Sequence, residues 1–174
     1  MIVGSHEVET VLNELLDVAI THLRAGSFYT NLYGFIRAIK EQGVISSNYG
    51  GDDKVVWVHP RDVAAAAAEE LEKSSSSQVR YVASDERTAS DTAQILGAAI
   101  GKPDLAWEIL SDEEVQSGFE QRGMPAQVAT LLVDLSASIH NGTLGEDYEQ
   151  HKPVLGEVKV EDFAKEFAAA FSKA

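Results

Sequence analysis

The chain has 174 residues, 44% of them hydrophobic, which is enough to bury one core, so we expect a single domain over residues 1–174. A formal net charge of −14, from 28 acidic and 14 basic residues, argues against nucleic acid or an anionic membrane as a partner bound through charge. The sequence has no cysteine, so disulfides and thiolate metal sites are excluded, and no apolar run is long enough to span a bilayer. The first residues do not match a signal peptide, and we expect a cytoplasmic protein.

The first third of the sequence predicts a helix, a strand and a second helix. Ser5 can cap a helix that ends near Leu16, and the alternating run over residues 20–23 predicts a strand with one buried face. A helix over residues 29–41 is expected to end at Gly43, a residue type that adopts the left-handed C-cap conformation easily. The predicted apolar stripe of the first helix comprises Val8, Val11, Leu12, Leu15 and Leu16.

Strands and helices continue to alternate in the middle of the chain. The β-branched run over residues 55–58 predicts a strand, and Pro60 starts a helix that runs to about Lys73 and contains five consecutive alanines. The serines at 74–77 indicate a solvated loop, and residues 79–83 predict the next strand. This alternation favours an α/β fold with short, mostly parallel strands.

Two capping-box patterns mark helix starts in the next segment. Thr88-x-x-Asp91 starts a helix that should end at Gly101, and Ser111-x-x-Glu114 starts one that should reach about Arg122. Between them, residues 107–110 are rich in strand-forming side chains and predict a strand or extended segment.

The last third predicts two further helices separated by an irregular region. Apolar residues at helical spacing follow Pro125, and the turn at 141–142 should end that helix. Residues 146–152 are charged and are expected to be irregular. Phenylalanines at four-residue intervals over 163–171 place three rings on one face of a terminal helix, which we interpret as a core face.

The sequence shows no strong catalytic or metal-binding motif. It contains no G-x-G-x-x-G loop and no G-x-S-x-G elbow, and the spacing of its five histidines predicts no metal site. His59, Arg61 and Asp62 form the densest polar cluster, and we interpret them as structural support for a strand-to-helix turn.

Five segments, taken in this order, resemble the C-terminal portion of the NmrA-like family of atypical short-chain dehydrogenase/reductases. They are SHEVETVLNELL, ITHLRAGSFYTNL, KVVWVHPRDVAAAAAEEL, VRYVASDERTASDTAQILGAAIGKP and GEVKVEDFAKEFAAAF. The resemblance covers about Ser5 to Phe171 and implies the C-terminal half of an NAD(P)-binding Rossmann-like protein. It also implies that the glycine-rich loop is not part of this sequence, so we expect no cofactor for this chain alone and NAD(P) for a full-length form.

The resemblance implies that residues 23–31 pass beside the nicotinamide end of the cofactor. The implied cleft wall comprises Arg24, Gly26, Phe28, Tyr29 and Asn31. In this reading Gly26 allows a close backbone approach, the two aromatic rings offer a flat apolar surface, and Arg24 and Asn31 offer donors. The alternative is that Phe28 and Leu32 are core and that Arg24 pairs with a surface carboxylate. Two departures from the family pattern, Ala25 for proline and Glu7 for lysine, disfavour dinucleotide binding.

Three functional hypotheses follow from the resemblance. The main one is a non-catalytic substrate- or partner-binding portion of an NAD(P)-binding regulator, which contacts a small molecule or a protein partner. The alternative is a fragment of an NAD(P)H-dependent reductase of quinones or similar small carbonyl compounds, inactive without its cofactor loop. The third is a homo-oligomer, because a cut parallel sheet exposes a strand edge that a second copy can cover.

Overall fold

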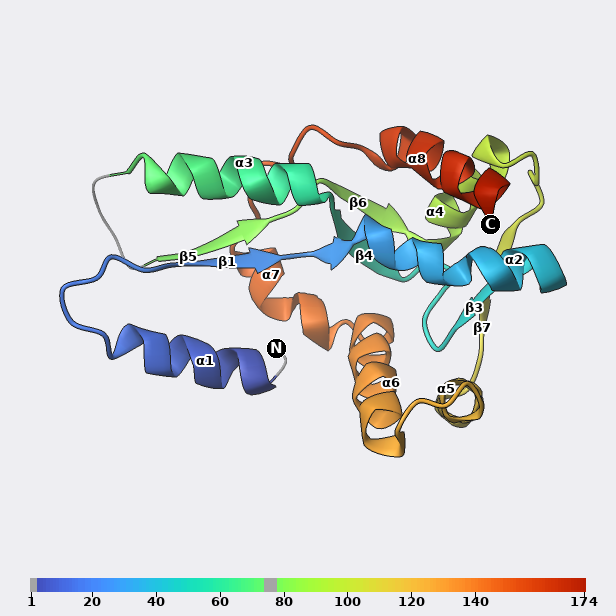
Figure 1. Ribbon diagram of the computed structural model, residues 1–174, viewed down its shortest axis with the longest axis horizontal. Helices are drawn as coiled ribbons and strands as arrows, with labels where there is room; N and C mark the ends of the chain where they lie inside the picture. Colours follow the sequence, from blue (N-terminus) through green and yellow to red (C-terminus); the bar gives the residue numbers. More distant parts are fainter. Residues whose placement is uncertain (1–2, 74–77) are drawn as a thin grey trace.

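The computed structural model describes residues 3–73 and 78–174 and shows an α/β fold (Figure 1). The helices are α1 (Val3–Asn13), α2 (Ile36–Gln42), α3 (Pro60–Leu71), α4 (Ala89–Ala99), α5 (Asp112–Gln121), α6 (Ala126–His140), α7 (Glu146–Gln150) and α8 (Val160–Lys173), with 3-10 turns η1 (Tyr29–Phe35) and η2 (Thr143–Gly145). The strands are β1 (Thr21–Ala25), β2 (Ser27–Phe28), β3 (Val44–Ser47), β4 (Lys54–Val58), β5 (Gln78–Val82), β6 (Asp85–Thr88) and β7 (Ala106–Ile109).

The strands form three small groups in which parallel pairs predominate. β1 pairs with β5, β2 with β4, and β3 with β7, each in parallel, whereas β6 pairs with β4 in the antiparallel direction. The prediction of short, mostly parallel strands is therefore confirmed. In an open parallel arrangement, ligands bind outside the carboxyl ends of the strands, so the ends of β1 and β5 are of most interest.

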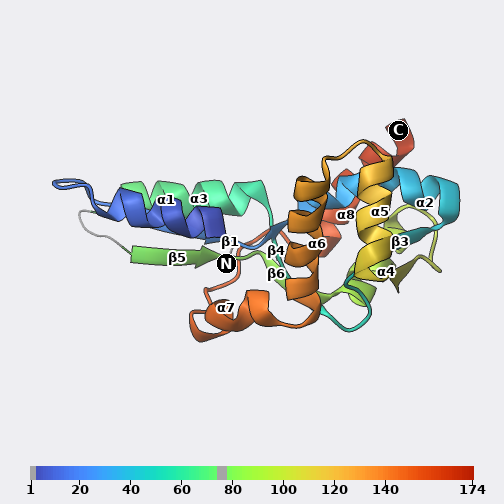
Figure 2. The ribbon, with the colours of Figure 1, turned by 90° about the horizontal axis from the view of Figure 1, so that it is seen from below.

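Helices cover the strands from both sides. Figure 1 shows α3 on one face of the β1–β5 pair and α1 and α7 on the other, which we call the lower face. At the opposite end of the molecule α8 packs on α4 and η1, and Figure 2 shows α5 and α6 side by side as a helical hairpin. In the parts of the chain that the structure describes, no helix has the length and apolar character needed to cross a bilayer.

The main core is aromatic and is formed where α8 meets β4 and η1. The ring of Tyr29 stacks on Trp57 with centroids 5.9 Å apart and on Phe163 with centroids 5.0 Å apart. Phe163 and Phe167 are both fully buried, and Phe171 packs at the edge of the cluster. The burial of these rings confirms the prediction of a phenylalanine core face on the terminal helix. Stacked aromatic pairs also stabilise a core beyond the area that they bury.

Most predicted helix ends agree with the structure. Gly43 has φ of 80° and ends α2, and the Ser111 side chain and Glu114 form both arms of the capping box of α5. Thr88 accepts the backbone N–H of Asp91 at 3.0 Å and caps α4.

Two local predictions are wrong, one strand was missed, and the predicted serine loop at 74–77 lies outside the described residues. The helix predicted from residue 29 starts as the 3-10 turn η1, because the buried ring of Tyr29 fixes this segment against the core. Residues 146–152 contain the helix α7 rather than an irregular segment, since this helix buries the ring of its own residue Tyr148. β6 was not predicted at all, because its residues Asp85–Thr88 are polar and gain strand structure only from pairing with β4.

The first helix is also shorter and less covered than predicted. α1 ends at Asn13, so Leu15 and Leu16 lie beyond it. The residues of the predicted apolar stripe are exposed by between 38% and 86%. An apolar stripe normally faces a core, and in this structure no such core covers it.

Candidate functional site

Arg24 and Tyr81 lie side by side near the carboxyl ends of β1 and β5. They are partners in the strand register, and both side chains project to the lower face, where α1 and α7 lie. The guanidinium carbon of Arg24 lies 5.7 Å from the centre of the Tyr81 ring. The parallel register therefore gathers a cation and an aromatic ring at the strand ends, where α/β folds bind ligands.

Arg24 is held by carboxylates from two helices. Its Nη2 lies 2.7 Å from Oε2 of Glu9 in α1, and its Nη1 lies 2.8 Å from Oδ2 of Asp147 in α7. Nη1 also donates to the Tyr81 hydroxyl at 3.2 Å. The hydrogen bonds that Arg24 donates to Glu9 raise the pKa of Arg24 further above its ordinary value. Arg24 therefore stays charged and is fixed in one orientation.

Asp147 connects this cation to a tyrosine and a histidine. The hydroxyl of Tyr81 donates to Oδ2 of Asp147, and Nδ1 of His151 lies 3.2 Å from Oδ1 of the same carboxylate. The Tyr81 hydrogen bond lowers the pKa of Asp147, whereas burial raises the pKa of Tyr81. The ring of His151 stacks over Tyr81 with centroids 6.3 Å apart. The Arg24 cluster, as we call Arg24, Glu9, Tyr81, Asp147 and His151, thus joins one cation to two carboxylates, a phenol and an imidazole.

A second network continues from the Arg24 cluster through α7. Tyr148 packs edge-on against Tyr81, and its hydroxyl donates to Oε1 of Glu86 at 2.7 Å. Nζ of Lys152 binds the other oxygen of Glu86 at 3.1 Å, and burial raises the pKa of Tyr148 above its ordinary value. Sequence reasoning missed these groups, because residues 146–152 were expected to be irregular; the single tyrosine among the charged residues there was the available signal.

The structure places the other predicted cleft residues in different environments. Phe28 is half-buried and packs against a small core cluster formed by Val58, Ala66 and Val82. Asn31 is exposed on η1. The expected role of Tyr29 as an open ring surface does not match its position, because the ring is fully buried between Trp57 and Phe163.

Gly26 and Arg24 also make contacts that stabilise the fold. A Cβ atom at Gly26 would lie 2.6 Å from the carbonyl oxygen of Val56, so the glycine allows β2 to lie close to β4. Arg24 is engaged by carboxylates, as the second reading of the sequence proposed, although these carboxylates are partly covered rather than fully on the surface. Whether the predicted cleft residues contact a ligand stays a prediction.

The polar cluster at the start of α3 ties three segments together. The ring nitrogen Nδ1 of His59 accepts the backbone N–H of Arg61 at 3.1 Å, and the carboxylate of Asp62 accepts the backbone N–H of Val158 at 3.2 Å. The hydroxyl of Ser84 donates to Asp62 and accepts the backbone N–H of His59 at 2.8 Å. These contacts join the start of α3 to the end of β5 and to the segment that leads into α8.

The predicted cleft lies within an unusual stretch of the sequence. Residues 18–40 contain no aspartate or glutamate, although the chain has 28 acidic residues in all. This stretch includes β1, β2, η1 and most of α2 and carries His22, Arg24, Arg37 and Lys40. The absence of acidic residues is a property of the sequence only, because in the folded chain Glu9 and Asp147 from other elements bind Arg24. Counting the gaps between acidic residues would have found this signal in the sequence alone.

The described residues do not fit the phosphates of a dinucleotide. A pyrophosphate needs a glycine-rich turn and a helix N-terminus free of negative charge. α3, α4 and α5 each follow a strand, and each carries a carboxylate in its first turn, from Asp62, Asp91 and Asp112 respectively. These carboxylates repel phosphate, so none of the three helices offers a dinucleotide site.

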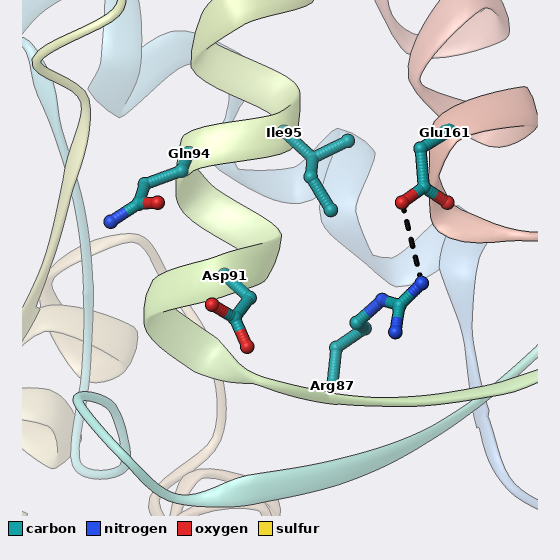
Figure 3. A pocket seen from close by; sticks show the side chains of 5 residues that line it. All are labelled: Arg87, Asp91, Gln94, Ile95 and Glu161. Carbon is teal, nitrogen blue, oxygen red and sulfur yellow. Dashed lines mark hydrogen bonds and ion pairs between the residues drawn. The ribbon is translucent and has the colours of Figure 1, made fainter.

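A pocket of about 310 Å³ lies between α4 and α8, and Figure 3 shows the side chains that line it. Its lining residues are Arg87, Asp91, Gln94, Ile95 and Glu161. Arg87 binds Glu161 at 3.3 Å and Asp85 at 3.4 Å, so its charge is already neutralised. No predicted cleft residue lines this pocket.

No protein-family model matches this chain. Among curated proteins it is similar to the NAD(P)H azoreductase of Xenophilus azovorans, with 29% identity over 161 residues that cover 90% of this chain and 56% of the azoreductase. The chain thus spans a little over half the length of this relative.

Solved structures show the same architecture. The NADPH-dependent quinone oxidoreductase QOR2 of Escherichia coli, complexed with NADPH, superposes with a TM-score of 0.76 at 24% identity, over 92% of this chain and 57% of that protein. The triphenylmethane reductase of Citrobacter sp., complexed with NADP(H), gives a TM-score of 0.70 at 22% identity, over 95% of this chain and 57% of that protein. The chain therefore has the α/β fold of NAD(P)-binding, Rossmann-like reductases.

Proposed function

We propose that this chain is the acceptor-binding portion of an NAD(P)H-dependent reductase of quinones, azo compounds or similar small electron acceptors. The observation that supports it most directly is the 29% identity to an azoreductase along 90% of the chain. The assignment within the reductases to the NmrA-like group is part of this proposal. It replaces the regulator as the main interpretation, because the curated relative is named as an azoreductase and the QOR2 structure as a quinone oxidoreductase.

In this proposal, the acceptor contacts the segment from Arg24 to Asn31 at the ends of β1 and β2. The segment itself carries no carboxylate, and its one cation, Arg24, is bound by Glu9 and Asp147 from other elements. The Arg24 cluster fixes the end of β1, the exposed amide of Asn31 offers a donor to a carbonyl or azo nitrogen, and the half-buried ring of Phe28 offers an apolar contact. These residues bind and orient the acceptor.

NAD(P)H supplies the hydride in such reductases, and the described residues do not fit its phosphates. A non-catalytic role is therefore the second candidate, in which the same segment binds a small molecule or a protein partner without turnover. The acidic first turns of α3, α4 and α5 favour this candidate for the chain by itself.

Binding can be tested by chemical-shift mapping with a water-soluble benzoquinone and with a sulfonated azo dye. The absence of cysteine from the chain removes the thiols, the side chains with which quinones react fastest. We expect the backbone amides of residues 24–31 to shift and the affinity to fall in Asn31→Ala but not in Gln127→Ala, a substitution of an exposed residue on α6. The proposal is wrong if neither compound shifts these amides.

Titration of the same protein with NADPH tests separately whether these residues bind a dinucleotide. We expect no binding of NADPH and no NADPH oxidation by these residues alone. Micromolar binding would contradict our conclusion that the described helix starts do not accept a pyrophosphate. Acceptor binding together with NADPH oxidation, in a polypeptide that joins these residues to a glycine-rich α/β segment, would favour the reductase over the non-catalytic role.

A further inference from the structure

The α5–α6 hairpin, residues 112–140, packs apart from the main core. Figure 1 shows it on the opposite side of the molecule from α8, and Figure 2 shows its two helices side by side. Its buried apolar side chains belong to Val115, Ala129 and Val133, and none of these is a member of either apolar cluster in the described chain. Ile139, near the end of α6, makes the contact with the main cluster. Elements with a small core of their own can unfold separately from the rest of a domain.

Both ends of the hairpin meet one loop, which joins β3 to β4 over residues 48–53. Nδ2 of Asn48 donates to Oδ1 of Asp112, the first residue of α5, at 2.7 Å. Oδ2 of Asp53 lies 2.7 Å from Nδ1 of His140, the last residue of α6. Since both attachments lie at the same loop, the hairpin can rotate about this loop while each helix keeps its own backbone hydrogen bonds.

A single buried amide binds both helices of the hairpin. Asn48 is 3% exposed and directly follows the last residue of β3. Besides its contact with Asp112, Nδ2 donates to the carbonyl oxygen of Val133, in the middle of α6, at 3.0 Å. Loss of this one amide group would therefore release the start of α5 and the middle of α6 together.

The carbonyl oxygen of the same side chain has no hydrogen-bond partner. Oδ1 of Asn48 is buried, and no donor of the described chain reaches it. A buried acceptor without a partner costs free energy relative to the same group in water. Opening of the hairpin would return Oδ1 to water and recover this cost. Two donor contacts thus hold the hairpin closed, while one unpaired acceptor favours its opening.

We propose that the α5–α6 hairpin is a lid that opens as one unit about residues 48–53, and that Asn48 is its latch. The hairpin starts just after the carboxyl end of β7 and covers Asn48 at the carboxyl end of β3, the parallel partner of β7. Opening breaks both contacts of Asn48 and exposes its amide at a strand end, where α/β folds bind ligands. The lid therefore controls access of solvent and solutes to this strand end.

Thiol labelling measures the opening directly. Because the chain has no cysteine, Ala129→Cys and Ala93→Cys each place a single buried thiol, the first in α6 and the second in α4 within the main core. A maleimide reaches such a thiol only after the surrounding structure opens. We expect Ala129→Cys to react at least roughly tenfold faster, since the hairpin opens without unfolding of the main core. Amide hydrogen exchange of the wild type should show α5 and α6 exchanging together, and faster than α4 and α8.

Asn48→Asp tests the latch. The substitution keeps the shape of the side chain but replaces the donor by a carboxylate that faces Oδ1 of Asp112 and the carbonyl oxygen of Val133. It should raise the labelling rate of Ala129→Cys by roughly tenfold or more and leave that of Ala93→Cys nearly unchanged. Adding Asp112→Asn places a donor opposite the new carboxylate and should recover part of the protection.

Asn13→Asp adds the same charge on α1 and is the matched control, which should leave the labelling of Ala129→Cys as it was. Circular dichroism confirms that each variant is folded, and Asp112→Ala, which removes the same contact from an exposed position, replaces Asn48→Asp if that variant is not. Equal labelling of the two buried thiols, separate exchange of α5 and α6, or an equal effect of Asn48→Asp on both thiols would each overturn the proposal. None of these results involves residues 24–31, so the proposed function holds or fails separately.

Discussion

Nη2 of Arg24 and Oε2 of Glu9 lie 2.7 Å apart and join the end of β1 to the polar side of α1. The two residues are 15 positions apart in the sequence, and both side chains are about four-fifths covered. The contact fixes which side of α1 faces the sheet. It therefore determines that the apolar side of the helix faces outward.

Arg24→Ala should lower the free energy of unfolding by roughly 1–2 kcal/mol, because it leaves the partly covered Glu9 carboxylate without its cation. Urea denaturation measures this change. Arg37→Ala is the control, since its ion pair with Glu41 is exposed, and it should have little effect. An equal loss of unfolding free energy in the two variants would show that the Arg24 ion pairs stabilise the fold no more than an exposed ion pair does.

Gly26→Ala should destabilise the protein by roughly 1–3 kcal/mol, because the new methyl group would lie 2.6 Å from the carbonyl oxygen of Val56, a backbone atom that cannot move alone. Gly34→Ala is the matched control: no atom lies within 4 Å of its Cβ position. It should be neutral or slightly stabilising, since alanine restricts the unfolded chain. Thermal unfolding of both variants gives the comparison, and a stable Gly26→Ala protein would contradict the close contact of β2 and β4.

Asp62→Ala should cost roughly 2–3 kcal/mol, because it leaves the Ser84 hydroxyl and the backbone N–H of Val158 without their acceptor in a buried place. Hydrogen exchange should show faster exchange at Val158 in this variant. Asp52→Ala changes an exposed carboxylate nearby in the sequence and should leave exchange at Val158 as it was. Unchanged protection of Val158 in Asp62→Ala would mean that another group holds this segment.

The contact between His140 and Asp53 should make stability depend on pH. Nδ1 of His140 lies 2.7 Å from Oδ2 of Asp53, and this hydrogen bond raises the pKa of His140 above its ordinary value of 6.5. Because the pKa is higher in the folded state, the stabilising contribution is complete below about pH 6.5 and is lost as pH rises through the folded pKa. NMR titration of the imidazole should show the raised pKa in the wild type and a lower one in Asp53→Asn. A pKa that Asp53→Asn does not change would show that the pair does not form in solution.

Local chemistry alone determined much of this fold. The ends of α2, α4 and α5 follow from Gly43, Thr88 and Ser111, because each residue satisfies backbone groups within its own turn. The core face of α8 follows from the four-residue spacing of its phenylalanines, since helical geometry turns that spacing into a single stripe.

Only the tertiary structure decided the candidate site and the exposed surface. Arg24 and Asp147 are 123 positions apart in the sequence, and no local pattern in either segment specifies their contact. Tyr29 was predicted to lie beside a ligand, but its ring is buried in the core. The ring of Phe163, from the C-terminal helix α8, stacks on it and covers it. The apolar stripe of α1 predicted a buried face, but whether that face is buried depends on which polypeptide lies beside it, and periodicity carries no information about the partner.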